Sequence, residues 1–217
     1  MYKTVVFDLD GTLLNTLTDL ADAGNRLCRK YGWPTHERQA YRYFVGNGIP
    51  KLVERLAPAD QRTPAVLEAA LADFKRDYGQ HLRDTTAPYP GIPEMLAKLK
   101  ANGVQLAVFS NKADALAKEV VKDYFGTQYF TIVRGQMTGV APKPAAEGTN
   151  ALLQALHADP ASTLYVGDSN VDVETAHSAN LPCCGAVWGF RTREELNAAG
   201  AEYLAENSDE LYDVIMK

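Results

Sequence analysis

The 217-residue chain lacks several features that mark large classes of proteins. No apolar run approaches the roughly 18–20 residues that cross a bilayer, so we expect no membrane span. The N-terminus "MYKTVVFDLD" has only a short apolar run before two acids, unlike a signal peptide. The three cysteines, Cys28, Cys183 and Cys184, have the spacing of neither a zinc site nor a disulfide framework. We therefore expect a cytoplasmic protein whose thiols are buried and reduced.

The chain also has no cluster of basic residues, and its formal net charge is −5. Binding to a phosphate backbone needs concentrated Lys and Arg, so nucleic acid is not an expected partner. The composition, 46% hydrophobic and 23% charged, is that of an ordinary globular protein. In a mildly acidic chain, a site for an anion has to create its own positive potential, which makes single lysines informative.

What the sequence does contain is a series of buried-strand patterns, each leading into a stretch that favours a helix. They lie at 4–10, 104–112, 163–169 and 183–190, with 129–135 as a candidate fifth. Strands that alternate with helices form a parallel sheet covered on both faces. The expected fold class is therefore α/β, with a doubly wound parallel sheet.

One long stretch, 16–84, interrupts that alternation. It contains no strand-like run but several helical ones, separated by Trp33-Pro34, by Gly46-Asn47-Gly48 and by the prolines at 58 and 64. We interpret 16–84 as an all-helical insertion, with 1–15 and 85–217 forming the α/β core.

Chemically useful side chains follow the predicted strands at their carboxyl ends, where open parallel sheets bind ligands. The first strand leads to Asp8 and Asp10, and the second to Ser110, Asn111 and Lys112. The strand at 163–169 leads to Gly167, Asp168, Ser169 and Asp172, while Lys143 precedes a helical run in "APKPAA".

Three acids near one sheet edge indicate a cation site. Alternation along a strand would put Asp8 and Asp10 on one side, with Leu9 pointing away. Crowded carboxylates repel each other, and a divalent cation relieves that repulsion. Mg²⁺ suits such oxygen ligands, and Asp168 is the natural additional ligand.

The other residues suit a phosphoryl group. Ser110, Asn111 and Ser169 offer hydrogen-bond donors, and Lys143 offers a compact positive charge. Gly11 lets the backbone turn sharply, and Thr12 adds a hydroxyl. Because a carboxylate can accept a phosphoryl group, these residues together predict Mg²⁺-dependent phosphoryl transfer.

Purely structural interpretations compete with these assignments. Ser110 and Asp172 are also typical of helix starts, and Lys143 of an exposed proline-rich loop. The glycine-rich stretch Gly46, Asn47 and Gly48 could present backbone N–H groups to an anionic substrate or form an ordinary turn between helices. Arg42, Lys51 and Arg55 are candidate substrate contacts or helix-surface charges, and "WGFR" (188–191) is a candidate for the rim.

The motifs together resemble those of the haloacid dehalogenase superfamily, in its phosphoglycolate phosphatase-like branch with a small helical cap. "DLDGT" resembles the first motif, Ser110 the second, Lys143 the third and "GDSNVD" (167–172) the fourth. The resemblance implies that Asp8 is the nucleophile and Asp10 the acid and base. It implies that Asp8, the Asp10 carbonyl and Asp168 hold Mg²⁺, that Ser110 and Lys143 bind the phosphoryl group, and that Asp172 steadies Lys143 or a metal-bound water.

Within this resemblance, several functions remain open. Asp10 argues against dehalogenases and phosphonate hydrolases, which lack the second aspartate. Leu20, where a mutase-type cap histidine would stand, argues against a sugar phosphomutase. We expect a phosphatase acting on a small phosphate ester, with 2-phosphoglycolate ahead of pyrophosphate or a nucleotide, and a monomer or homodimer. From a different class, a non-catalytic phospho-aspartate switch or scaffold would carry similar acids.

Overall fold

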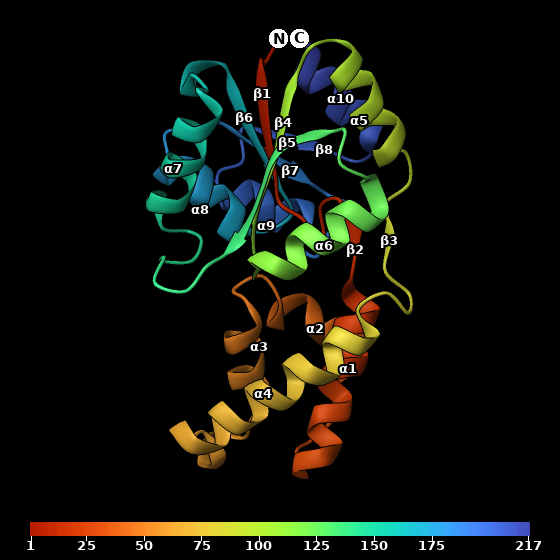
Figure 1. Cartoon of the computed structure of the whole chain (residues 1–217), viewed down its shortest axis with the longest axis vertical. Helices are drawn as coiled ribbons and strands as arrows, with labels where there is room; N and C mark the ends of the chain where they lie inside the picture. Colours follow the sequence, from red (N-terminus) through yellow and green to blue (C-terminus); the bar gives the residue numbers. More distant parts are fainter. The chain divides into compact units, whose positions relative to one another are not determined.

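The computed structural model describes all 217 residues and divides into two compact units (Figure 1). The core unit comprises Met1–Leu14 and Pro88–Lys217, and the helical unit comprises Asn15–Ala87. The sequence predicts an insertion at 16–84. The helical unit begins one residue before that range and ends three residues after it, because the boundary residues belong to two short strands, β2 (Leu14–Asn15) and β3 (Ala87–Pro88).

A six-stranded sheet forms the centre of the core unit, in the order β5-β4-β1-β6-β7-β8, and every neighbouring pair is parallel. The strands are β1 (Thr4–Phe7), β4 (Gln105–Ala113), β5 (Phe130–Gln136), β6 (Thr163–Gly167), β7 (Cys183–Ala186) and β8 (Tyr203–Ala205). The predicted α/β class is confirmed. Because β1 lies between β4 and β6, the residues that follow these three strands meet at one edge of the sheet.

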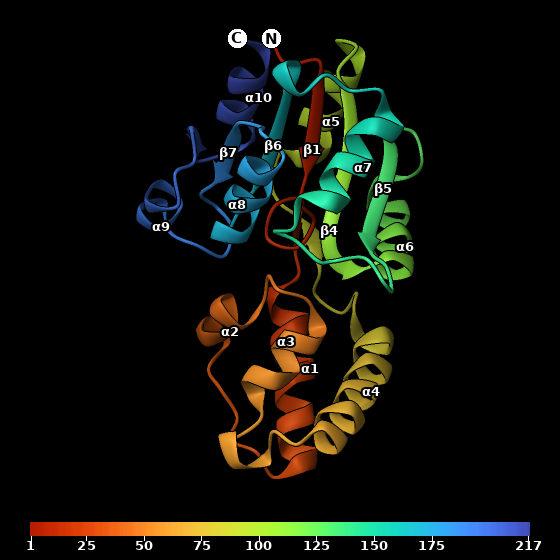
Figure 2. The same ribbon diagram turned by 90° about the vertical axis from the view of Figure 1, so that its left-hand side faces the viewer.

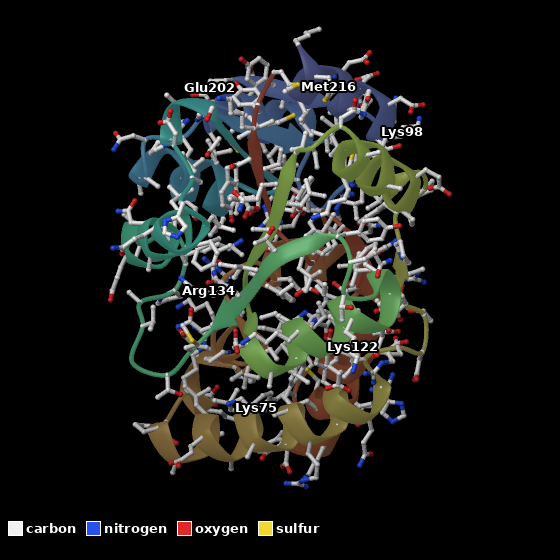
Figure 3. All side chains as sticks on the ribbon, turned by 45° about the horizontal axis from the view of Figure 1, so that its top comes forward. Lys75, Lys98, Lys122, Arg134, Glu202 and Met216 are labelled. Carbon is white, nitrogen blue, oxygen red and sulfur yellow. The ribbon has the colours of Figure 1, made fainter.

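Helices cover both faces of the sheet (Figures 1 and 2). One layer contains α7 (Ala146–Leu156), α8 (Asn170–Ser178) and α9 (Arg193–Ala198), and the other contains α5 (Ile92–Ala101), α6 (Asp114–Phe125) and α10 (Ser208–Met216). Side chains fill the space between sheet and helices (Figure 3), and the first layer packs Leu152, Val173 and Leu196 against Val6 and Tyr165. No helix is both long and apolar enough to cross a membrane.

The predicted strand at 4–10 is too long, because β1 ends at Phe7. Asp8 still donates its N–H to Val166 O at 2.8 Å, but the chain then turns, and Leu9 O accepts from the N–H groups of Thr12, Leu13 and Leu14. Strand alternation therefore does not orient Asp8 and Asp10. The predicted strands at 163–169 and 183–190 end early for the same reason: their last residues form the loops of the site.

The end of β4 is irregular, and this irregularity positions site residues. Phe109 pairs with Arg134 and Ala113 with Gln136, so β4 carries two more residues than β5 between these pairs. Such a bulge redirects side chains at strand ends. Gly135 makes the close approach possible, since a Cβ there would lie 2.4 Å from Lys112 O. Ser110, Asn111 and Lys112 lie within the bulged segment.

The helical unit contains α1 (Leu17–Tyr31), α2 (Arg38–Phe44), α3 (Ile49–Leu56), a short 3₁₀ helix at Ala59–Gln61 and α4 (Pro64–His81). Its chain ends are held together by Asp19, which is buried and accepts hydrogen bonds from the backbone N–H and hydroxyl groups of Thr85 and Thr86.

All three cysteines of the chain are free and buried, as expected.

Candidate active site

Lys143 lies at the centre of the polar cluster at the sheet edge. It comes from the loop between β5 and α7, and its side chain is only 1% exposed, so the interpretation as an exposed loop lysine is wrong. Its Nζ lies 2.9 Å from Asp8 Oδ1 and 2.7 Å from Asp172 Oδ1, and it also contacts Tyr165 Oη at 3.2 Å and Phe109 O at 3.4 Å. The two carboxylates compensate the charge of this buried ammonium, which could not stay buried without them.

Asp172 binds Lys143 with one carboxylate oxygen and the loop after β6 with the other. While its Oδ1 accepts from Lys143, its Oδ2 accepts from the N–H groups of Asp168 and Ser169 at 3.2 and 3.1 Å and from Ser169 Oγ at 2.7 Å. The close packing needs Gly167, because a Cβ there would lie 2.2 Å from Asp172 Cβ. The hydroxyl of Ser169, a predicted substrate contact, is therefore used within the loop.

Asp8, Asp168 and Asp172 form a buried acidic cluster in which one oxygen of each lies within 4.8 Å of the others. Burial, and then the nearby Asp172, raise the pKa of Asp8 to about 7, against the opposing effect of Lys143. Burial, Asp172 and Asp8 also raise the pKa of Asp168 well above its usual range. Although burial opposes its charge, the carboxylates of Asp172 and Asp8 hold the pKa of Lys143 above its usual value.

This donor set fits a divalent cation. Asp8 Oδ1 is buried, and its 2.9 Å ion pair with Lys143 Nζ leaves it a free lone pair for a cation. When ionised, the three acids carry more negative charge than Lys143 neutralises, and all the candidate ligand atoms are carboxylate oxygens, which Mg²⁺ prefers. Asp8 and Asp168 are the residues best placed to bind it, because both oxygens of Asp172 already accept hydrogen bonds, Oδ1 from Lys143 and Oδ2 from the loop after β6.

The raised pKa of Asp8 predicts how stability depends on pH when no metal is bound. The folded protein holds this proton up to about pH 7, whereas an unfolded aspartate loses it near pH ~4. The stabilisation is therefore complete below pH ~4 and is lost as the pH rises through about 7. Thermal unfolding in EDTA from pH 5 to 8 should show the Asp8→Asn variant gaining in relative stability as the pH rises. A difference in Tm that does not change with pH would contradict this assignment.

Asp10 forms a separate ion pair, with Lys112. Lys112 follows the second predicted strand, but no motif in the sequence assigns it a role. Lys112 Nζ lies 3.0 Å from Asp10 Oδ1 and 3.3 Å from Oδ2, and the lysine side chain is 2% exposed. The pair depends on the bulge in β4, which no sequence pattern indicates. Its sequence signal is weak, because Lys112 is only one polar residue among three after a strand.

Ser110 and Asn111 lie beside this pair, and both are buried. Helix α6 begins at Asp114, so the interpretation of Ser110 as its N-terminal cap is wrong. The side-chain amide of Asn111 accepts from Lys143 N at 2.9 Å and donates to Lys143 O at 3.3 Å. Asn111 thus holds the loop of Lys143, which is a different task from the predicted contact with phosphate.

Gly11 and Thr12 form the turn after Asp10. Gly11 has φ +89°, and a Cβ there would lie 2.3 Å from Asp168 Oδ2, so this turn needs glycine. Thr12 is fully buried and donates its hydroxyl to Asp168 Oδ1 at 3.2 Å. The turn therefore packs directly against the third acid of the site.

The remaining predicted substrate contacts lie in the helical unit. Gly46 and Gly48 have φ +111° and +83°, and Gly48 is the N-terminal cap of α3. Arg55 donates to Asn47 Oδ1 and to Phe44 O, both at 2.8 Å, so it holds the turn at 46–48. Lys51 pairs with Glu54 on an exposed helix surface. The functional assignments of the residues at 46–48 stay predictions.

Comparison with known proteins identifies the family. A family model described as haloacid dehalogenase-like hydrolase matches residues 5–186. The chain belongs to this family. It is 31% identical over 216 residues to a phosphoglycolate phosphatase of Chromobacterium violaceum, covering 98% of this chain and 96% of that one. A phosphoglycolate phosphatase of Thiobacillus denitrificans is 31% identical over 191 residues, 87% of this chain and 84% of the relative.

Solved structures agree with this assignment. A crystal structure of a protein from Lactobacillus delbrueckii subsp. bulgaricus, assigned to the same activity, superposes with a TM-score of 0.93 at 28% identity and covers 99% of this chain and 98% of that one. The expected superfamily and phosphoglycolate phosphatase-like branch are thus confirmed, and so is the prediction of a phosphoric monoester hydrolase.

Proposed function

We propose that this hydrolase is a Mg²⁺-dependent phosphatase that cleaves 2-phosphoglycolate through a phosphorylated Asp8. The observation that carries the proposal is the buried Asp8, whose Oδ1 lies 2.9 Å from Lys143 Nζ within the acidic cluster. The substrate assignment is supported by relatives named phosphoglycolate phosphatase that align with nearly the whole chain.

Asp8 is paired with Lys143 and Asp10 with Lys112, and the two aspartates take different roles in the proposed reaction. An oxygen of Asp8 attacks phosphorus while the bond to the leaving alkoxide breaks, and Asp10 gives the alkoxide its proton. Asp10 then takes a proton from a water molecule that attacks the same phosphorus, which releases Asp8 and phosphate. Lys143 and Ser110 neutralise and orient the phosphoryl oxygens.

The acidic cluster is the natural place for the metal. The Asp8 carboxylate, the Asp10 carbonyl and Asp168 would hold Mg²⁺, which when bound supplies a Lewis acid for the phosphoryl oxygens. We further propose that the helical unit is the cap, and that its turn at 46–48 contacts the organic part of the substrate. The substrate is a small molecule, and the protein works in the cytoplasm as a monomer or homodimer.

Loss of Lys112 should lower kcat most for substrates whose leaving group needs a proton. Without its ammonium group, Asp10 loses a partner that fixes its carboxylate. The Lys112→Met variant should lose about 10²-fold in kcat with 2-phosphoglycolate, because general acid catalysis contributes factors of this order. The loss should be smaller with p-nitrophenyl phosphate, whose leaving group needs little protonation.

Steady-state kinetics with both substrates would measure this difference. Lys118→Met is the matched control, because it breaks an exposed Lys118–Asp114 pair of 2.7 Å and should leave kcat unchanged. Equal losses of Lys112→Met on the two substrates would show that Lys112 does not act through Asp10.

Phosphate release from a panel of metabolites tests the proposed function. The panel should contain 2-phosphoglycolate, a sugar phosphate, pyrophosphate and a nucleoside monophosphate, each with MgCl₂ and with EDTA. We expect the highest kcat/KM with 2-phosphoglycolate and no turnover in EDTA. Turnover in EDTA would overturn the metal assignment, and isomerisation of the sugar phosphate without phosphate release would indicate a mutase. Phosphate retained on Asp8 without turnover would indicate a switch.

A further inference from the structure

The segment 188–191, "WGFR", follows β7 and lies against the acidic cluster. From the sequence, this segment is a candidate for the rim of the site. In the structure Phe190 and Arg191 are buried, and their backbone N–H groups point to Asp168: Phe190 N donates to Oδ2 at 2.7 Å and Arg191 N to the carbonyl at 3.3 Å. The segment therefore binds both the carboxylate and the main chain of one predicted metal ligand.

The two oxygens of Asp168 are held from opposite parts of the chain. Thr12 Oγ1 donates to Oδ1 at 3.2 Å, while Phe190 N donates to Oδ2. A carboxylate has about four lone-pair sites, so each oxygen retains one for a cation. The two hydrogen bonds fix the plane of the carboxylate and leave its ability to bind a metal intact.

The same segment also holds the turn after Asp10. Trp188 Nε1 donates to Thr12 O at 3.0 Å. At Gly189 the contact is tighter, since a Cβ there would lie 2.2 Å from Asp168 Cβ and 2.6 Å from Gly11 O. Gly189 thus lies between the two backbone segments that carry Asp10 and Asp168, in a space that admits no side chain.

We propose that residues 188–190 are a positioning segment for the divalent-cation site. Trp188 sets the turn that carries the Asp10 carbonyl, the Phe190 N–H sets the Asp168 carboxylate, and Gly189 lets both approach. Outer groups that orient ligands in this way typically change metal affinity by about 10–100-fold when they are altered. The inference rests on the proposed function only in taking Asp8, Asp10 and Asp168 as the metal-binding residues.

Metal affinity measured without substrate tests this inference. The midpoint of thermal unfolding is followed as MgCl₂ is increased, because a ligand that binds only the folded state raises Tm with the logarithm of one plus the ratio of ligand concentration to Kd, and a titration therefore yields Kd. We expect the apparent Kd for Mg²⁺ to rise by about 10–100-fold for Gly189→Ala and by about tenfold for Trp188→Phe, which keeps an aromatic ring but removes the donor. Both variants should recover activity at high MgCl₂.

The controls separate this effect from general damage. Gly79→Ala is the matched substitution, because a Cβ at Gly79 meets nothing within 4 Å, and it should leave the Mg²⁺ dependence unchanged. Asp168→Asn should abolish it. If Gly189→Ala does not fold, Trp188→Phe decides the question alone. Wild-type affinity in a folded Trp188→Phe variant overturns the inference, whereas a wild-type protein without any Mg²⁺-dependent shift overturns the proposed metal site itself.

Discussion

The Asp8→Asn variant should lose about 10⁴-fold or more of the phosphatase activity, because removal of a nucleophile eliminates the covalent route. An amide oxygen does not attack phosphorus at a useful rate, and Asp172, the other carboxylate beside Lys143, has both oxygens occupied by hydrogen bonds. The substitution preserves the size of the side chain and removes a charge that burial disfavours, so the variant should fold. Single-turnover phosphate release measures the remaining activity.

The matched control is Asp209→Asn, which removes a carboxylate that is 90% exposed in α10. Its activity should equal that of the wild type. If the folded Asp8→Asn variant kept more than about one tenth of the wild-type rate, Asp8 would not be the nucleophile.

Lys143→Met should have the second-largest effect, on both stability and catalysis. The variant leaves the buried carboxylates of Asp8 and Asp172 without their shared cation. Breaking a buried ion pair from one side costs about 3–5 kcal/mol of unfolding free energy, because the remaining charge stays buried. Activity should fall by about 10²–10³-fold, the usual cost of losing a group that stabilises transition-state charge. Denaturation by urea and steady-state kinetics measure the two effects.

A second substitution distinguishes the two roles of Lys143. Adding Asp172→Asn removes one of the uncompensated charges, so the double variant should regain part of the lost stability but none of the activity. Lys122→Met is the control, since Lys122 is exposed on α6 (Figure 3) and should change neither quantity. If the double variant were no more stable than Lys143→Met alone, the loss would not come from uncompensated charge.

Local sequence predicts the site residues that directly follow a strand, because the same pattern of an apolar run and then a polar residue recurs at several strands. Apolar runs followed by Asp8, Ser110 and Asp168 indicated both a parallel sheet and the edge where these residues meet. No pattern in the sequence predicts strand β8, because it has only three residues at the sheet margin, and their burial runs from exposed Tyr203 to buried Ala205 without alternation. The length of β1 was overestimated because Leu9 is as apolar as a strand residue, although it is buried in a turn.

Contacts between distant segments could not be predicted from local patterns. The pair of Lys112 and Asp10 depends on a bulge, which is set by pairing between β4 and β5 and by the close approach at Gly135. The amide of Asn111 is paired with the backbone of Lys143, although its chemistry suits phosphate equally well. Residue type indicates what a side chain can bind, whereas the tertiary fold decides which partner it has.

The most direct test of the central claim uses the Asp10→Asn variant with p-nitrophenyl phosphate. This leaving group departs without a proton, but the variant has no base to activate water, so the phosphorylated enzyme should accumulate. We predict a burst of one p-nitrophenolate per active site, and after acid quench and borohydride reduction, homoserine at position 8. Steady turnover without a burst, or a burst with phosphate on a residue other than Asp8, would contradict the account.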